Sequence, residues 1–504
     1  MRSPLSIACT ALILAAALLA AVAFPAQAGF EAPVPLNPND PGADLRIRFL
    51  ADQQPAEALA PQAMTPCVGG MAGSYPCNNI DLGAFLPNAA IGGGSASSIW
   101  GWTDPLTGKE YALMGRTNGT SFVDITDPAN PIYLGNLPTA TSSSSWRELK
   151  AYETYAYIIS DSNGSHGMQV FDLTQLRNVT SPPVTFTAPR YTLFGSAHDI
   201  TINPDTGYLY VTGISTGGAN ACSGSLHMID VSDAGNPTFA GCAGSAYTHD
   251  TTCVVYHGPD AQHRGKEICI NSNGNQSNGG QVVVMDVTNK AAPALISARS
   301  YAGAGYVHQG WLTEDHRYFY LDDELDEMNF GHNTKTYVWD MVDLDNPVLV
   351  HTYNGPTTAI DHNQFIVGNR SYQANYRAGL RILDISNPLA PFESAYFDTY
   401  PANNNANFNG AWGNYPFFDS GAVIVSSIGE GLFVLLPRPL CTWRDLDCSC
   451  QVDALDLTLA AQSWNCGLGD ACYRARVDRD RDGLVTVADM MQFSAEWGWT
   501  CPAP

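Results

Sequence analysis

The stretch SFVDITDPANP at residues 121–131 decides the fold class of this chain, because its pattern returns along the sequence. The pattern is an apolar run that ends in Asp, followed by a turn rich in Asn, Asp and Pro. Further copies end at Asp172, Asp230, Asp286, Asp340 and Asp384, and GLFVLLPRP at residues 431–439 is a copy without the Asp. The long and slightly uneven spacing of these Asp positions matches a four-stranded blade with variable loops. We therefore predict an all-β repeat domain.

The repeat predicts a seven-bladed β-propeller over residues 96–439. Its seven units start near Ser97, Ser143, Ser196, Tyr247, Tyr306, Ala359 and Asn407. A closed ring of blades leaves no exposed sheet edge, whereas an open β-solenoid, the competing architecture, suits shorter and more even periods. The repeated Asp is predicted to cap the turn after its strand, since six equivalent copies indicate a scaffold and not six active sites.

The N-terminal segment, residues 1–28, has the features of a signal peptide. Arg2 supplies the positive end, residues 12–22 form an apolar run, and residues 26–28 (Ala-Gln-Ala) form a cleavage site. The run is too short for a good permanent membrane span, and no second candidate follows it. We therefore predict a mature chain that begins at Gly29 and is secreted or displayed at the cell surface, without a transmembrane anchor.

Residues 29–95 are predicted to be a lead-in segment, and residues 440–504 a separate C-terminal module. The thirteen cysteines fit export, because twelve remain after Cys9 is removed with the signal peptide. Their clustering predicts the local disulfides Cys67–Cys77, Cys222–Cys242 and Cys253–Cys269. The last of these flanks a predicted hairpin, where facing strands bring two Cβ atoms within bridging distance. Pairing among the six C-terminal cysteines stays open.

The charge of the chain excludes one class of partner. The formal net charge is −24, and only 14% of the residues are charged. A nucleic-acid-binding protein needs a basic face to contact phosphates, so nucleic acid is not an expected partner. An acidic chain is instead suited to binding cations.

Aligning the repeats by their first strand places four histidines at one equivalent position: His198, His249, His308 and His362. Trp100, Trp146 and Asn409 are predicted to take that position in the other three units. The first strand of a propeller blade lines the central channel, so the imidazoles are expected around one mouth of it. The second strand runs back to the same face, which brings Asp322, Asp323, Glu324, Asp326 and Glu327 towards them, together with Asp161, Arg116 and Arg377.

Three interpretations of this face stay open. The imidazoles can be hydrogen-bonded channel residues that pack the axis. They can bind a small-molecule or glycan-type ligand, or they can hold a transition metal, because neutral imidazole with carboxylate suits zinc, copper, iron or manganese. The first interpretation needs no ligand at all.

Other catalytic motifs are weak or missing. The G-x-S-x-G match at residues 213–217 lies between predicted strands, whereas a nucleophile elbow needs a strand that leads into a helix. The sequence has no H-E-x-x-H, phosphate-binding or dinucleotide motif. No catalytic residue is assigned, and whether the chain is an enzyme stays undecided.

The C-terminal module carries a calcium-loop pattern. Acidic residues stand at loop positions 1, 3, 5 and 12, Gly483 stands at position 6, and position 7 offers a backbone carbonyl. The predicted ligands of this loop are Asp478, Asp480, Asp482, Leu484 and Asp489. Earlier in the module the pattern occurs in a weaker form, with Cys450 in place of the glycine. The predicted ligands there are Asp445, Asp447, Ser449, Gln451 and Asp456.

Two parts of the chain resemble known protein families. Long strings between Cys67 and Pro437, including CVGGMAGSYPCNNIDLGAFLP, YTHDTTCVVYHGPD, HQGWLTED and LDDELDE, closely resemble the choice-of-anchor B family of LVIVD-like repeat propellers. That resemblance implies a secreted or surface-displayed propeller whose attachment device differs between members, and it implies no established reaction. The C-terminal module resembles a Cys-containing dockerin, which implies Ca²⁺ and a cohesin-like or other surface receptor.

We therefore predict a secreted or surface-displayed propeller with a binding or interaction role, anchored through its calcium-dependent module. The alternative is an extracellular metal-dependent enzyme, a hydrolase or an oxidoreductase, that uses the histidine-lined face. The ligand of the propeller is not identified by the sequence.

Overall fold

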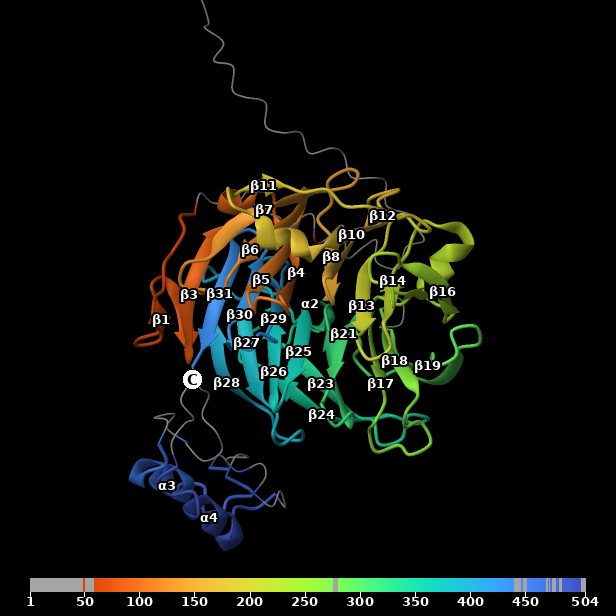
Figure 1. Ribbon diagram of the computed structural model, residues 1–504. Helices are drawn as coiled ribbons and strands as arrows, with labels where there is room; N and C mark the ends of the chain where they lie inside the picture. The colour runs from red at the N-terminus through yellow and green to blue at the C-terminus, as the bar shows by residue number, and fades with distance from the viewer. Residues whose placement is uncertain are drawn as a thin grey trace, which may run out of the picture. The chain divides into compact units, whose positions relative to one another are not determined.

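The computed structural model in Figure 1 describes Phe49 and residues 59–274, 280–438, 446, 451–467, 470, 472–473, 477–479 and 483–499. Seven β-sheets form blades around a common axis, and this confirms the seven-bladed propeller. The innermost strands contact one another in turn and return to the first, which closes the ring: β4 (Ala96–Thr103), β8 (Arg147–Tyr152), β13 (Asp199–Asn203), β17 (Asp250–Val255), β21 (Val307–Leu312), β25 (Asn363–Val367) and β29 (Ala411–Tyr415). Each begins close to a predicted unit start.

The remaining strands of the first four blades follow in chain order. The first blade adds β5 (Glu110–Arg116), β6 (Gly119–Asp124) and β7 (Ile132–Pro138), with β11 (Val184–Thr185) parallel to β7. The second adds β9 (Tyr155–Ser160), β10 (Met168–Asp172) and β12 (Arg190–Tyr191). The third adds β14 (Tyr208–Thr212), β15 (Leu226–Asp230) and β16 (Thr238–Ala243), and the fourth β18 (Glu267–Asn273), β19 (Gln281–Asp286) and β20 (Ala294–Arg299).

Of the last three blades, the sixth and the seventh include strands from the N-terminal part of the chain. The fifth blade adds β22 (Tyr318–Asp323), β23 (Lys335–Asp340) and β24 (Val348–Asn354). The sixth adds β26 (Arg370–Ala374), β27 (Leu380–Asp384) and β28 (Phe392–Phe397), then β2 (Tyr75–Asn78) and β1 (Met71–Ala72). The seventh adds β30 (Val423–Ser427), β31 (Gly431–Pro437) and β3 (Ile80–Pro87). Short 3-10 helices are η1 (Asn88–Ile91), η2 (Leu173–Asn178) and η3 (Gly218–Gly224), and α2 (Asp326–Phe330) follows β22.

Strand β3 joins the two ends of the propeller. It pairs antiparallel with β31, so the outermost strand of the last blade comes from a segment that precedes the first blade (Figure 1, red beside blue). This segment falls within residues 29–95, where we expected only a lead-in. Its Leu82 and Phe85 are fully buried, and the Phe85 ring lies 4.5 Å from that of Phe433 between centroids. The ring is therefore closed by hydrogen bonds and apolar packing between distant parts of the sequence.

Most of the apolar core lies between neighbouring blades, and a further cluster that includes Phe49, Trp146 and Trp412 packs beside the axial histidines. Phe122 of β6 stacks on Phe171 of β10, with centroids 4.5 Å apart, and both are fully buried. Similar clusters join other neighbouring blades. Along the axis a small cavity is lined by the apolar side chains of Ile99, Trp311 and Phe365 and by polar ones that include Ser98, Glu148, Asp199, Asp250, Gln309 and Asn363.

The repeated Asp has the structural role predicted for it. In all six copies its carboxylate accepts a hydrogen bond from the backbone N–H two residues on, at 2.9 to 3.0 Å. The contact stabilises the turn that leads from the third strand of a blade towards the fourth.

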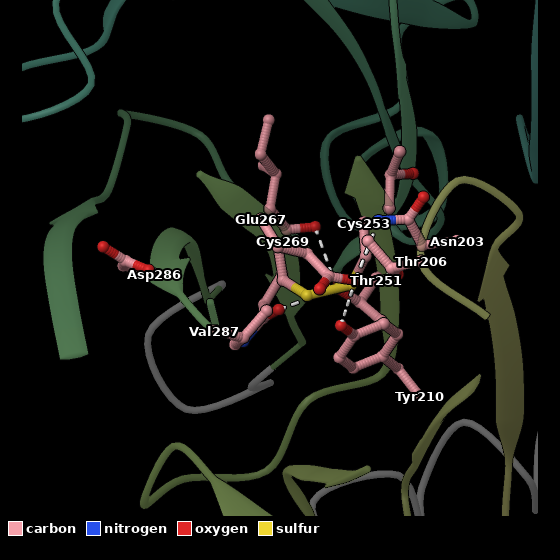
Figure 2. Close-up of a disulfide and its surroundings, with 12 residues drawn as sticks. Asn203, Thr206, Tyr210, Thr251, Cys253, Glu267, Cys269, Asp286 and Val287 are labelled. Atoms are coloured by element: carbon pink, nitrogen blue, oxygen red, sulfur yellow. Dashed lines mark hydrogen bonds between the residues drawn. A yellow bond between two sulfur atoms is a disulfide. The ribbon is translucent and has the colours of Figure 1, made fainter. Parts of the chain in front are cut away.

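The three disulfides predicted from cysteine clustering are present: Cys67–Cys77, Cys222–Cys242 and Cys253–Cys269. Figure 2 shows the last of these, which links facing residues of β17 and β18. Glu267 lies beside it and accepts hydrogen bonds from Tyr210 and Asn203 of the third blade. The disulfide links two strands within the fourth blade, and the Glu267 carboxylate links this blade to the third.

The described part of the C-terminal module contains two short helices with equivalent N-terminal caps. Helix α3 (Ala454–Ala461) and helix α4 (Val487–Ser494) have the same length and contact each other. Each begins with a capping box, formed by Asp453 with Asp456 in one helix and by Thr486 with Asp489 in the other. Cys466 pairs with Cys472 in this module. The repeat seen in the sequence is thus an internal repeat of structure.

Candidate metal centre on the propeller axis

The structure gathers the four histidines of the repeats on one arc around the axis. His198, His249 and His362 immediately precede their innermost strands, and His308 is the second residue of β21. Successive ring centroids lie 4.2, 4.2 and 4.4 Å apart in chain order. Four imidazoles from four blades are therefore in contact.

Two tryptophans continue the arc. Trp146 precedes β8, as expected, but the seventh blade contributes Trp412 and not Asn409. Trp412 lies in a β-bulge of β29, at the same place where His308 bulges out of β21. In the first blade the irregularity spans residues 97–98, so serines stand at this level and Trp100 lies further along the channel. The simple alignment of repeats took no account of these bulges and placed Asn409 where Trp412 stands.

The imidazoles enclose a small cavity. Its volume is ≈ 20 Å³, and the four histidines line it together with Trp146 and Trp412. Phe49 packs against both tryptophans, with ring centroids 5.3 and 5.5 Å away. A space of this size holds one water molecule or one ion. It does not accommodate a sugar ring, so the geometry does not support a glycan-type ligand between the imidazoles.

Hydrogen bonds fix the orientation of three imidazoles. Nδ1 of His249 lies 3.2 Å from the carbonyl oxygen of His308, and Nδ1 of His362 contacts the carbonyl oxygen of Trp412 at 2.5 Å. A carbonyl oxygen only accepts, so Nδ1 carries the proton in both rings. Nδ1 of His198 lies 2.9 Å from the Asp161 carboxylate and donates to it in the same way.

The buried rings are neutral. Burial lowers the pKa of His249 and His308 well below the usual value, and neighbouring histidines lower it further. Burial also lowers the pKa of His362 to about 3. A neutral ring that donates from Nδ1 carries an unshared electron pair on Nε2. Metal-binding histidines in proteins show this same arrangement, with the second nitrogen anchored to a carbonyl or a carboxylate.

Glu324 faces the Nε2 atoms of His308 and His362. Its Oε2 lies 3.6 Å from Nε2 of His308, and its Oε1 lies 3.7 Å from Nε2 of His362. Tyr376 donates to Oε1 at 2.7 Å, whereas Oε2 is buried without a hydrogen-bond partner. Burial raises the pKa of Glu324 to about 8.

These separations are those of ligands around a shared ion. They are too long for hydrogen bonds. Two ligands bound at about 2.1 Å to one tetrahedral metal stand about 3.4 Å apart. One nitrogen of His249, one of His308 and an oxygen of Glu324 all lie within 4.8 Å of one another. The residues that could hold a metal are therefore His249, His308 and Glu324, with His362 and His198 beside them.

The other acidic residues predicted for this face are directed elsewhere. Asp323 accepts hydrogen bonds from the Tyr301 hydroxyl and the Gly305 N–H, and Asp322 accepts one from Gln364. Because successive residues of a strand alternate between faces, a run of acids cannot all reach one point. Within the run only Glu324 contacts the imidazoles in the described structure.

Arg377 does not join the imidazoles either. Its guanidinium donates to Asn403 and lies over the Tyr400 ring, 5.3 Å from the centroid. Arg116 binds Ser121 and Asn136 within the first blade. Asp161, Arg116 and Arg377 were expected on this face because the second strand of each blade runs back towards it. Of these three, Asp161 contacts a histidine of the arc.

Sequence reasoning missed two residues of the centre, Tyr376 and Trp412. Tyr376 anchors Glu324 from a turn where its φ is 35°, an unusual backbone angle for a residue other than glycine. A tyrosine in a loop carries no signal of that kind in the sequence. Trp412 did have a signal in the sequence, because it stands in GAWG at the start of the last repeat. The bulge of β29 prevented its position in the strand from being predicted.

The calcium-loop residues are described only in part. Asp480, Asp482, Asp445, Asp447 and Ser449 lie outside the described residues. In the second loop Asp478 is buried, its Oδ2 accepts from the Gly483 N–H and the Tyr473 hydroxyl, and its Oδ1 has no hydrogen-bond partner. Leu484 and Gln451, the two positions predicted to offer backbone carbonyls, are among the described residues.

The two position-12 carboxylates are equivalent. Asp456 accepts from the Leu446 N–H at 2.5 Å, and Asp489 accepts from the Arg479 N–H at 2.6 Å. Each is fully buried. A buried carboxylate at the start of each helix and an unpartnered Asp478 oxygen fit the ligand set of a hard cation.

Comparisons with known proteins agree with the repeat. A family model described as LVIVD repeat matches residues 365–399, which span most of the sixth blade. Among solved structures, the β-propeller domain of Cps50 (Swd1) from Myceliophteria thermophila has 10% sequence identity and a TM-score of 0.44, and the match covers 68% of this chain and 97% of that chain. Curated proteins gave no match. The chain thus has a seven-bladed propeller with an LVIVD-like repeat.

One further finding concerns membranes. Among the residues that the structure describes, no helix combines the length and the apolar character needed to cross a bilayer.

Proposed function

We propose that this chain is a secreted or surface-displayed propeller of the choice-of-anchor B type that holds a transition metal ion on its axis. In this proposal the ion is bound by His249, His308 and Glu324, with His362 and His198 available as further ligands. The C-terminal module is a dockerin-like device that attaches the propeller to a cohesin-like or other surface receptor when Ca²⁺ is bound.

One observation carries the axial site. The four imidazoles line a cavity of ≈ 20 Å³, Nδ1 of His249 and of His362 is anchored on a backbone carbonyl, and the buried Glu324 carboxyl lies 3.6 Å from Nε2 of His308. Without a cation, the Nε2 electron pair of His362 and the Glu324 carboxyl can face each other only if Glu324 keeps its proton, and a bound metal ion would take the place of that proton. Nitrogen and oxygen donors together suit zinc, copper, iron or manganese.

The size of the cavity bears on the kind of function. A metal-dependent hydrolase needs room beside the metal for its substrate, and ≈ 20 Å³ offers none for an organic molecule. The geometry therefore favours a binding protein with an inner metal ion. An oxidoreductase remains the second candidate, because transfer of an electron through the metal, or reaction with a molecule as small as dioxygen, needs little space.

Metal analysis of the full-length chain, purified without chelators, tests the axial site. We expect about one equivalent of a transition metal per chain. The double variant His249→Gln/His308→Gln should lose it. The matched control is His227→Gln, because His227 is also a buried imidazole but is bonded to Tyr191 and to the Asn220 carbonyl, away from the axis. Equal metal content in all three proteins would contradict the proposal.

Limited proteolysis tests the calcium-dependent module. We expect Ca²⁺ to protect the region of α3 and α4 in the full chain, since metal binding orders loops of this kind. Asp478→Asn should abolish the protection, whereas Asp470→Asn, which removes an acid that bonds only to the nearby Gly467 N–H, should keep it. Cleavage at the same rate with and without Ca²⁺ would exclude the calcium role.

A further inference from the structure

A single phenylalanine closes one mouth of the axial channel, directly beside the histidines. The Phe49 side chain is 3% exposed, and its ring lies 5.3 Å from that of Trp146 and 5.5 Å from that of Trp412 between centroids. The ring of Phe408 lies 5.9 Å away on the same measure. Both tryptophans line the cavity that the four imidazoles enclose. The Phe49 ring therefore packs on the aromatic wall of the proposed metal centre.

The contacts of Phe49 lie at the face of the propeller where the innermost strands begin. Phe49 belongs to an apolar cluster whose members stand just before an innermost strand or just after the second strand of a blade: Tyr306, Leu325, Ile360, Phe408 and Ile428. The four imidazoles stand at the same strand starts. The ring consequently covers the histidines from this side of the propeller.

A second phenylalanine, Phe417, closes the opposite mouth. Its ring lies 5.8 Å from that of Phe365 and 6.2 Å from that of Trp311 between centroids. Phe365 and Trp311 line the second small cavity of the axis. The two axial cavities share the lining residues Glu148, Asp199, Asp250 and Asn363. They therefore follow each other along the axis, with Phe49 at the histidine end and Phe417 at the other end.

The two phenylalanines differ in how the fold holds them. Phe417 stands in the connection between β29 and β30 of the seventh blade. Ser420, in the same connection, donates to the Glu110 carboxylate from its backbone N–H and from its hydroxyl. Phe49 precedes β1 in the chain, and none of the seven sheets contains it. Phe49 can therefore leave its place without breaking a strand pair of the blades, whereas Phe417 is held within one blade.

We propose that Phe49 is a removable cover of the axial centre, and that metal ions and molecules of similar size enter and leave the axis at this mouth. The inference rests on the proposed axial metal site. An apolar ring packed on Trp146 and Trp412 excludes water from the imidazoles and retains a bound ion, as closing segments do over other buried sites. Opening needs only the contacts of one side chain to be lost, so it is a local event that leaves the propeller folded.

The rate at which a chelator removes the transition metal from the full-length chain tests the cover. We expect Phe49→Ala to bind as much metal as wild type and to release it at least tenfold faster, because the smaller side chain leaves the mouth open. Phe49→Leu, which keeps a larger apolar group, should release it at an intermediate rate. The matched control is Phe417→Ala at the opposite mouth, which should change the rate less than twofold. Equal rates for wild type and Phe49→Ala, or faster release from Phe417→Ala alone, would overturn the proposal.

Chemical modification of the histidines separates failure of the cover from failure of the metal site. Diethyl pyrocarbonate acylates unprotonated imidazole nitrogens, and the reaction needs no bound metal. In chelated protein we expect His249 and His362, mapped by mass spectrometry, to react at least tenfold faster in Phe49→Ala than in wild type or Phe417→Ala.

Each combination of results has one meaning. Wild-type protein that held no metal, but whose histidines became reactive in Phe49→Ala, would refute the metal site and keep the cover. Wild-type protein that held the metal, with equal histidine reactivity in all three proteins, would refute the cover and keep the metal site. Circular dichroism establishes that each variant is folded, and Phe49→Leu replaces Phe49→Ala in both measurements if the alanine variant loses its native spectrum.

Discussion

At the scale of single residues, Glu324 links the scaffold to the proposed chemistry. Tyr376 anchors one of its oxygens, and the other faces His308. Without a metal the pair is satisfied only if Glu324 keeps its proton, which agrees with the raised pKa of about 8. A bound cation would take the place of that proton.

This gives a pH prediction for the chelated protein. The pKa of Glu324 rises from 4.5 to about 8 on burial, so the folded state holds a proton that the unfolded state releases. The stability due to this proton is fully present below about pH 4.5 and is lost as pH rises to about 8. Relative to wild type, Glu324→Gln should gain roughly 3–5 kcal/mol in the free energy of unfolding between pH 5 and pH 8. Urea unfolding at the two pH values measures it, and parallel behaviour of the two proteins would rule out the protonated carboxyl.

The sequence was informative about some residues of the centre and silent about others. The four histidines could be placed at one level because each stands beside the start of an innermost strand, and strand period carries that information. The tautomers could not be predicted, since they depend on the carbonyls of His308 and Trp412 in neighbouring blades.

At the scale of elements, the repeated strand–Asp–turn unit was the most predictable part of the molecule. The contact that stabilises its turn is local: the Asp286 carboxylate accepts from the N–H of Thr288, two residues on. Hairpin disulfides are similarly local. Cys253 and Cys269 face each other across β17 and β18, so hairpin register alone predicts their pairing.

The Cys253–Cys269 disulfide should contribute measurably to stability. It closes a loop with a sequence separation of 16, which corresponds to about 2–4 kcal/mol in the free energy of unfolding. We expect Cys253→Ala/Cys269→Ala to lose this amount in urea unfolding under non-reducing conditions. The Lys290–Glu267 ion pair beside it should persist in the variant. A loss below about 0.5 kcal/mol would contradict the assignment of a stabilising role.

At the scale of the whole molecule, the number of blades followed from the period, but the closure of the ring did not. The sequence of β3, IDLGAFLP, does not end in the Asp and turn of the repeats, and its partner β31 follows all the other strands of the propeller in the chain. No local pattern reports a pairing over that distance. The lead-in prediction for residues 29–95 missed this strand for that reason.

Because β3 closes the ring, we expect its buried Phe85 to contribute strongly to the stability of the whole propeller. Phe85→Ala removes a ring that packs on Phe433 and Tyr75 and should cost about 3–5 kcal/mol in the free energy of unfolding. Phe239→Ala, on the outer strand β16 where the ring is 40% exposed, should cost much less. Thermal unfolding compares the two. Equal effects would mean that the ends of the propeller do not depend on β3.

The central claim is that a metal ion lies on the axis between imidazoles of different blades, and anomalous X-ray scattering from crystals of the native full-length chain tests it most directly. We expect an anomalous peak, strongest above the absorption edge of one transition metal, within coordination distance of His249, His308 and Glu324. A cavity that holds only a water molecule, with no anomalous signal in protein never exposed to a chelator, would contradict the claim.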